Sequence, residues 1–227
     1  MSTRLGKYRL LKQIAQGGMA EIFLATQQGP AGFEREVVVK RILPERASDP
    51  QFVEMFLKEA YVAAAMSHPN IVQIIELGEH EGTYFIAMEA VRGISVGQLI
   101  ERMTSFGLRV PPRYCARVVS DICAGLAYAH GFHVSADQRG ILHRDVSPDN
   151  VLISYNGAVK IIDFGVARAA DDASPANANA ILGKMRYLSP ERAEGRPVDA
   201  RSDLFGLAIV FYEMLTAEHP FGNAKGL

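Results

Sequence analysis

The sequence predicts an α+β fold, with a strand-rich N-terminal part and a mostly helical C-terminal part. Up to residue 90, β-branched and aromatic runs are separated by glycine-containing turns, which is typical of antiparallel strands. Beyond residue 90, apolar residues recur at helical spacing over two long stretches. Between these stretches, Asn156-Gly157 separates two β-branched runs and indicates a hairpin.

Five strands and one helix are expected in the N-terminal part. The strands are placed at residues 8–16, 21–28, 35–43, 71–77 and 83–90. After the third strand, Asp49-Pro50 supplies a helix N-cap and a first-turn proline. Apolar residues then follow at helical spacing, namely Phe52, Met55, Phe56, Ala60 and Ala63. His68-Pro69-Asn70 is expected to end this helix before the fourth strand.

The C-terminal part is expected to hold three helices around the hairpin. A short helix is placed at residues 99–105 and a longer one at 111–130. The hairpin strands are placed at residues 151–153 and 159–162. Residues 204–215 are apolar nearly all round, which predicts a buried central helix.

Composition narrows the classes of protein. The 227 residues are 48% hydrophobic and 22% charged, as in soluble proteins with one large domain or two lobes. A formal net charge of −1 offers no basic field for nucleic acid or anionic lipid. Charges interrupt the N-terminal apolar stretch, so no signal peptide is expected. The longest apolar run, residues 204–212, is too short to span a bilayer, so we expect a cytoplasmic protein.

The two cysteines are expected to be reduced and buried. Cys115 and Cys123 lie in one predicted helix, about 12 Å apart along its axis. This separation exceeds the roughly 7 Å limit on the Cα–Cα distance of a disulfide. Free cysteine is among the most buried residue types.

Polar residues gather at the open end of the predicted hairpin. Asp145 and Asn150 precede it, and Asp163 follows it. Carboxylates placed together repel one another unless a cation joins them, and hard oxygen ligands suit magnesium. The stretch 141–165 therefore predicts a metal-dependent site.

This stretch resembles the catalytic and metal loops of the protein kinases. His143-Arg144-Asp145 with Asn150, followed by Asp163-Phe164-Gly165, has the family's motifs at the family's spacing. The resemblance is to eukaryotic-type (Hanks-type) serine/threonine kinases of the bacterial kind. It implies a bilobal protein-kinase-like fold, with a five-stranded N-lobe over residues 1–89 and a helical C-lobe over residues 90–227. The C-lobe would lack the family's last helices.

The resemblance also implies roles for these residues. Asp145 would accept the proton of the attacking hydroxyl and align it with the γ-phosphate of ATP. Asn150 and Asp163 would hold Mg²⁺. Lys40 ends a β-branched run, and Glu59 follows it by 19 positions among apolar helix residues. A kinase uses such a lysine–glutamate pair to orient the α- and β-phosphates.

A nucleotide pocket is implied around the glycine turn and the segment that joins the lobes. Its members would be Ile14, Ala15, Gln16, Gly17, Gly18, Met19, Ala20, Glu21, Ile22, Val38, Lys40, Met88, Glu89, Val91 and Leu152. Met88 would take the gatekeeper position, and the backbone of Glu89 to Val91 would bind the adenine edge. The glycine turn departs from the family pattern, because Ala15 and Ala20 stand where the family has glycine.

Two further departures concern charge near the reacting phosphate. Most serine/threonine kinases have lysine two positions after the catalytic aspartate, where this chain has Ser147. Upstream of Ser189-Pro190-Glu191, the family's Gly-Thr pair is Gly183-Lys184. We hypothesise that the ammonium group of Lys184 lies beside Asp145 and Ser147 as an additional catalytic group. Ser174 is the candidate phosphosite for ordering of this segment through Arg144.

The motifs bear on three functions. Pro148 and the lack of the tyrosine-kinase Ala-Ala-Arg sequence favour a kinase for protein serine and threonine. A dimer is expected for autophosphorylation. A pseudokinase or nucleotide-binding scaffold is the alternative, because the resemblance ends before the helix whose arginine would pair with Glu191. That ending also predicts exposed hydrophobic surface on the central helix. A dinucleotide-binding enzyme would need a helix after the glycine turn, where residues 21–28 read as a strand. Asp203 is expected to tie the catalytic-loop backbone.

The Lys184 hypothesis predicts that Lys184→Met lowers kcat for phosphoryl transfer, since the positive charge beside Asp145 would be lost. Steady-state kinetics with radiolabelled ATP would measure it. A variant that keeps the full kcat would refute the hypothesis.

Overall fold

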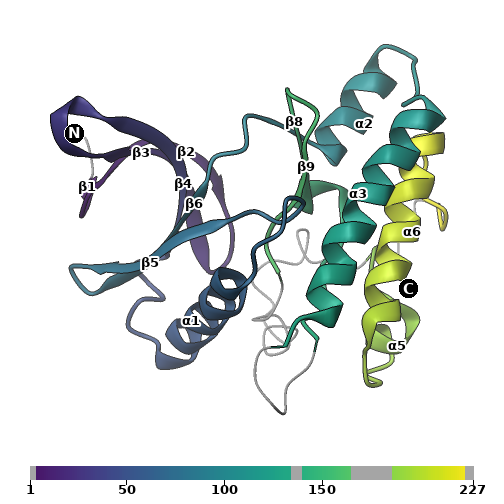
Figure 1. The fold of residues 1–227 in the computed structure, drawn as a ribbon. Coiled ribbons are helices and arrows are strands. Elements are labelled where there is room, and N and C mark those ends of the chain that lie inside the picture. The colour runs from purple at the N-terminus through teal and green to yellow at the C-terminus, as the bar shows by residue number, and fades with distance from the viewer. Residues whose placement is uncertain (1–3, 134–139, 165–185, 223–227) are drawn as a thin grey trace. The chain divides into compact units, whose positions relative to one another are not determined.

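The computed structural model describes residues 4–133, 140–164 and 186–222 (Figure 1). The chain divides into two compact units. Unit 1 comprises residues 1–67 and 72–90, and unit 2 comprises residues 68–71 and 91–227. Among the described residues, no helix has both the length and the apolar character needed to cross a bilayer.

Unit 1 is an antiparallel sheet with one α-helix. The strand order is β1-β2-β3-β4-β6-β5. The strands are β1 (Arg4–Leu5), β2 (Tyr8–Gln16), β3 (Ala20–Gln28), β4 (Glu34–Ile42), β5 (Ile74–His80) and β6 (Thr83–Glu89), with a 3-10 turn η1 at Pro30–Gly32. The five expected strands are present, and β1 adds a two-residue edge strand.

The helix of unit 1, α1 (Pro50–Ala65), begins where the sequence predicts. The Asp49 side chain accepts a hydrogen bond from the Gln51 N–H, and Pro50 stands in the first turn. Phe56 and Ala60 are its buried residues. These two side chains pack α1 within unit 1, and Glu59 lies between them in the sequence.

The predicted strand at 71–77 begins three residues too early. β5 starts at Ile74, and Ile71 instead forms a parallel bridge with Ile161 of unit 2. Asn70 explains the difference: its side chain donates to the Val159 carbonyl at 3.0 Å, and its own carbonyl accepts from the Ile161 N–H at 2.8 Å. These long-range bonds take residues 68–71 out of the unit 1 sheet.

Unit 2 combines helices with a three-stranded sheet of order β7-β8-β9. Its elements are β7 (Gly93–Ser95), α2 (Val96–Ser105), α3 (Pro112–Gly131), η2 (Pro148–Asn150), β8 (Val151–Ser154), β9 (Val159–Ile161), α5 (Pro190–Ala193) and α6 (Ala200–Thr216). The hairpin β8–β9 turns at Asn156-Gly157 as predicted, and Gly157 has the positive φ of 87° that such a turn requires.

The central helix α6 differs from its prediction in two respects. Asp199 is its N-cap and accepts from the Arg201 N–H at 2.8 Å, so the helix begins at Ala200, before the predicted start at residue 204, and Asp203 lies in its first turn. Leu207, Val210 and Met214 are buried, whereas Leu204 and Tyr212 are 48% and 42% exposed. The helix is therefore buried on one face and is not buried all round as predicted.

The prediction that both cysteines are buried is wrong for one of them. Cys115 is buried, but Cys123 is exposed. Eight residues correspond to about 80° of net rotation around a helix, so the two side chains point in different directions. Burial raises the pKa of the Cys115 thiol.

The backbones of β7 and β8 approach closely at Gly93. A Cβ at this position would lie 2.0 Å from the Ile153 carbonyl oxygen. We therefore expect Gly93→Ala to force β7 away from β8 and to lower the free energy of unfolding by about 1–3 kcal/mol. Gly131→Ala is the matched control, because a Cβ there meets nothing within 4 Å. Chemical denaturation of both variants tests this, and equal stability would contradict it.

Candidate active site

In unit 1 the predicted lysine–glutamate pair is formed. Lys40 Nζ lies 2.5 Å from Glu59 Oε1, and the side chains are only 14% and 15% exposed. β4 carries the lysine and α1 carries the glutamate. An ion pair of this kind positions the ammonium group precisely enough to act on a bound anion, because little water competes for it.

The glycine turn between β2 and β3 is closed by its own backbone. The Gly17 N–H donates to the Ala20 carbonyl at 2.9 Å, and the Leu43 N–H donates to the Met19 carbonyl at 2.9 Å. Ile14 to Gly18 are exposed, and Ala20 is buried. Ile22 stands directly opposite Lys40 in the β3–β4 register, so their side chains share one face of the sheet.

The same register places further predicted pocket residues on that face. Val38 lies opposite Met88, and both share the face of Lys40 because alternate residues of a strand point the same way. Glu21 points to the other face, where Arg41 binds its carboxylate at 2.7 Å. The charge of Glu21 is thus neutralised within unit 1. Val91 and Leu152 lie in unit 2 and are half-buried.

In unit 2 the catalytic loop is organised by Asp203. Its carboxylate accepts from the backbone N–H groups of His143 and Arg144, at 2.8 and 2.7 Å. His130 on α3 completes the cluster, with Nε2 2.7 Å from Asp203 Oδ2. Asp203 is only 2% exposed. The expectation that Asp203 ties the loop backbone is confirmed.

The charge state of Asp203 follows from these contacts. Burial, the largest single effect, raises the pKa of the carboxyl group. The hydrogen bonds from His130 and from the two backbone N–H groups, together with the interaction with His143, act in the opposite direction and prevail. The pKa of Asp203 therefore lies below its ordinary value, and the group is a carboxylate at neutral pH.

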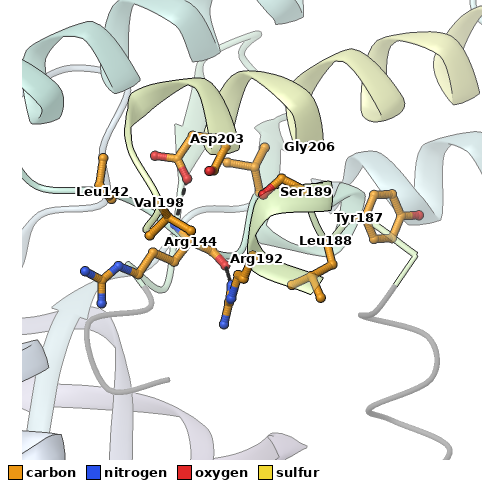
Figure 2. Close-up of a pocket in the computed structure, with 11 residues that line it drawn as sticks. Leu142, Arg144, Tyr187, Leu188, Ser189, Arg192, Val198, Asp203 and Gly206 are labelled. Carbon is orange, nitrogen blue, oxygen red and sulfur yellow. Dashed lines mark hydrogen bonds between the residues drawn. The ribbon is translucent and has the colours of Figure 1, made fainter. Parts of the chain in front are cut away.

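The peptide groups of Arg144 are held in a strained conformation. Arg144 has a φ of 62°, in the left-handed region that costs a non-glycine residue about 1–2 kcal/mol. Asp203 binds its N–H, and the guanidinium group of Arg192 binds its carbonyl (Figure 2). Charge-assisted bonds at both ends offset the strain. Arg192 was not identified from the sequence.

Asp145 is oriented by its neighbours in the loop. Its N–H donates to His143 Nδ1 at 3.2 Å, while His143 Nε2 lies 3.0 Å from the Ile162 carbonyl. In this arrangement Nδ1 of the ring is the acceptor, and Nε2 faces a carbonyl oxygen as the donor. Asn150 Nδ2 donates to both the backbone carbonyl and Oδ2 of Asp145, at 2.8 and 2.7 Å. The carboxylate of Asp145 thus has a defined direction.

Asn150 also links this loop to the metal-loop sequence. The Ile162 N–H donates to the Asn150 carbonyl at 3.0 Å, which places Asp163 next to the same peptide. Asp163 has a φ of 56°, a second strained residue in the site. Because Asn150 uses its amide nitrogen on Asp145, Oδ1 is its atom for a metal. Amide and carboxylate oxygens of Asn150 and Asp163 fit Mg²⁺.

A small cavity lies beneath this loop. Leu142, Arg144, Leu188, Ser189, Arg192 and Asp203 are among its lining residues (Figure 2). Its volume of about 20 Å³ is enough for one water molecule and not for a ligand. The cavity is therefore a packing feature beside the loop and is not a ligand-binding site.

The segment after residue 185 is anchored to α6. The Tyr187 hydroxyl donates to Glu213 Oε2 at 2.8 Å. Burial and then this hydrogen bond raise the pKa of Tyr187 far above its usual range. Ser202 donates to the Glu191 carboxylate, which lowers the pKa of Glu191. Glu191 thus has a partner within this chain.

The remaining predicted residues differ in what the structure says of them. Lys184, Ser174 and Gly165 lie outside the described residues. Ser147 is 3% exposed, and its hydroxyl has no hydrogen-bond partner among the residues that the structure describes. Sequence reasoning did not identify His130 as part of the site. Its position in the last turn of α3 was the only signal for it.

The fold and the site define a protein kinase domain. The family model for this domain, described as "Protein kinase domain", matches residues 8–227. The chain belongs to this family.

Particular relatives agree with this assignment. The chain is 44% identical over 223 residues to the tyrosine-protein kinase MasK of Myxococcus xanthus, covering 98% of this chain and 34% of the relative. It is 38% identical over 222 residues to the serine/threonine-protein kinase PrkC of Bacillus subtilis, covering 98% and 32%. The kinase domain of PknI from Mycobacterium tuberculosis superposes with a TM-score of 0.72 at 28% identity, covering 100% of this chain and 79% of that one. The chain spans about a third of the length of its curated relatives.

Asp203→Asn is expected to lower the free energy of unfolding by about 3 kcal/mol, as for other broken buried charge networks. The amide NH₂ would face backbone N–H donors. Because the pKa of Asp203 in the folded protein lies below its ordinary value, its contribution is fully present at neutral pH and is lost as the pH falls through the folded pKa. The difference in free energy of unfolding between the wild type and Asp203→Asn should therefore become smaller at acidic pH.

Asp199→Asn is the matched control on the same helix, since asparagine caps helices as well as aspartate. Denaturant titrations between neutral pH and pH 3 would measure both variants. A difference for Asp203→Asn that stays constant with pH would contradict the assignment.

Proposed function

We propose that this chain is the catalytic domain of a serine/threonine kinase that transfers the γ-phosphoryl group of ATP to protein hydroxyls. The observation that carries the proposal is the orientation of Asp145 by Asn150 and His143. Such a carboxylate accepts a proton from a hydroxyl aligned for in-line attack. The curated relatives PrkC and PknB are named serine/threonine kinases, which supports the choice of acceptor.

The other residues supply charge and position. Lys40, held by Glu59, binds the α- and β-phosphates, and the turn around Gly17 lies over them. Asn150 and Asp163 would hold Mg²⁺, which would supply positive charge to neutralise the phosphate oxygens. The hydroxyl proton passes to Asp145 Oδ as the oxygen–phosphorus bond forms. ADP is the leaving group.

The acceptor and the setting are parts of the same proposal. MasK is named a tyrosine-protein kinase, so the relatives of this chain include proteins named as tyrosine kinases and as serine/threonine kinases. We place serine and threonine first because Pro148 follows the pattern of that class. A cytoplasmic, signalling role with autophosphorylation in a dimer completes the proposal.

Asp145→Asn should reduce phosphoryl transfer at least a hundredfold, because the general base and the aligning carboxylate are lost together. The assay compares radiolabel transfer from ATP to a serine/threonine-rich substrate protein for the wild type and the variant. Phosphoamino-acid analysis identifies the acceptor. Equal transfer by both proteins would remove the kinase proposal, and phosphotyrosine alone would remove the choice of acceptor.

A further inference from the structure

Arg192 reaches the catalytic loop from the short helix α5. Its guanidinium group donates to the main-chain carbonyl of Arg144, 48 positions earlier in the chain (Figure 2). Arg192 is half-buried, so less water competes for this hydrogen bond than at an exposed site. A cation of α5 therefore contacts the residue directly before Asp145.

The carbonyl that Arg192 binds belongs to the peptide group that leads into Asp145. Because a peptide bond is planar and trans, the Arg144 C=O and the Asp145 N–H form one rigid group and point in opposite directions. The Asp145 N–H donates to His143 Nδ1 at 3.2 Å. Arg192 thus holds one side of this plane, and His143 holds the other. The orientation of the plane sets φ of Asp145, and with it the direction in which the side chain leaves the backbone.

The two contacts with this peptide group differ in strength. The bond from the Asp145 N–H, at 3.2 Å, is at the long end of the usual range. The bond from Arg192 is charge-assisted, and such bonds are about twice as strong as those between neutral groups. It also acts on Arg144, whose φ of 62° a peptide without such contacts would avoid. Arg192 is therefore the stronger of the two restraints.

The backbone from which Arg192 extends is itself fixed to α6. Ser202 on α6 donates to the carboxylate of Glu191, which directly precedes Arg192. The Arg192 N–H donates to the Ser189 carbonyl at 3.1 Å, within the turn that forms α5. The helix that carries Asp203, which binds the loop N–H groups, therefore also anchors the residue that binds the loop carbonyl.

We infer that Arg192 is a positioning residue for the catalytic carboxylate, because its guanidinium group sets the peptide plane that leads into Asp145. The inference rests on the proposed function, in which Asp145 aligns the attacking hydroxyl with the γ-phosphate. Asn150 holds the carboxylate end of Asp145, and Arg192 holds its backbone end. Arg192 acts through Asp145 and not on the nucleotide, so its loss changes turnover and leaves ATP binding as it is.

The test compares Arg192→Met and Arg192→Lys with the wild type, each as the full chain. Methionine keeps an unbranched side chain but removes every donor, so the peptide plane loses its stronger restraint. We expect kcat for transfer from radiolabelled ATP to fall about tenfold to a hundredfold, with KM for ATP unchanged. Lysine keeps a cationic donor and should recover most of the lost kcat.

Arg196→Met is the matched control. The Arg196 side chain is 60% exposed and binds the equally exposed Glu194 at 2.6 Å. Its removal should change neither kcat nor KM. Isothermal titration with ATP counts the folded nucleotide sites of each variant, so kcat is expressed per site and an unfolded fraction does not lower it.

Hydrogen exchange at the Asp145 N–H gives a readout that does not depend on activity. In Arg192→Met this N–H should exchange faster, because the peptide plane can rotate away from His143 Nδ1. The N–H groups of His143 and Arg144 should keep their protection, since Asp203 holds both of them. NMR of the three amide groups measures the exchange rates. Equal loss of protection at all three would indicate general loosening of the loop and would overturn the inference.

The outcomes separate the inference from the proposed function. An Arg192→Met protein with the wild-type kcat per site, or with a loss that appears only in KM, overturns the inference and leaves the kinase proposal intact. An Arg192→Lys protein no more active than Arg192→Met does the same. A wild type that binds ATP but transfers no phosphoryl group overturns the kinase proposal. The exchange rates then decide the inference: faster exchange at Asp145 alone supports it, and unchanged exchange overturns it.

Discussion

The catalytic loop depends on one buried carboxylate. Asp203 accepts two backbone N–H groups and contacts a histidine, so α3, α6 and the loop meet at a single side chain. A neutral acceptor has too few lone pairs in the right directions for three donors, and an unsatisfied donor in this interior would cost about 1–3 kcal/mol. The loop geometry, and with it the direction of Asp145, therefore depends on a charge that never meets the substrate.

The strained residues of the site follow from the same constraint. Arg144 and Asp163 both have positive φ, which an isolated peptide would avoid. Asp203 and Arg192 hold the peptide groups of Arg144, and the bond between Asn150 and Ile162 holds the chain before Asp163. Strain of this kind persists only where surrounding contacts determine it. The site is thus preorganised before any ligand arrives.

Local patterns explain what was predictable. The strands, the cap at Asp49 and the turn at Asn156-Gly157 depend on neighbours in sequence, and the motif spacing identified Asp145, Asn150 and Asp163. The bond of His130 to Asp203 joins residues 73 positions apart, and no periodicity encodes it. Arg192 and the true start of β5 likewise depend on partners elsewhere in the chain. Cys123 was misplaced because helix phase, which decides its exposure, was not applied to it.

The assignment of residues 68–71 to the second unit bears on how the protein can be divided. The first unit is not a continuous piece of chain, because residues 68–71 belong to the second unit, where Asn70 and Ile71 pair with β9. A gene fragment ending at residue 90 would leave Asn70 and Ile71 without those partners. During synthesis, likewise, Asn70 and Ile71 cannot bond to β9 until more than 60 residues beyond residue 90 have been made. The sequences of the two units are thus interleaved, and a cut at residue 90 would not separate one complete unit from the other.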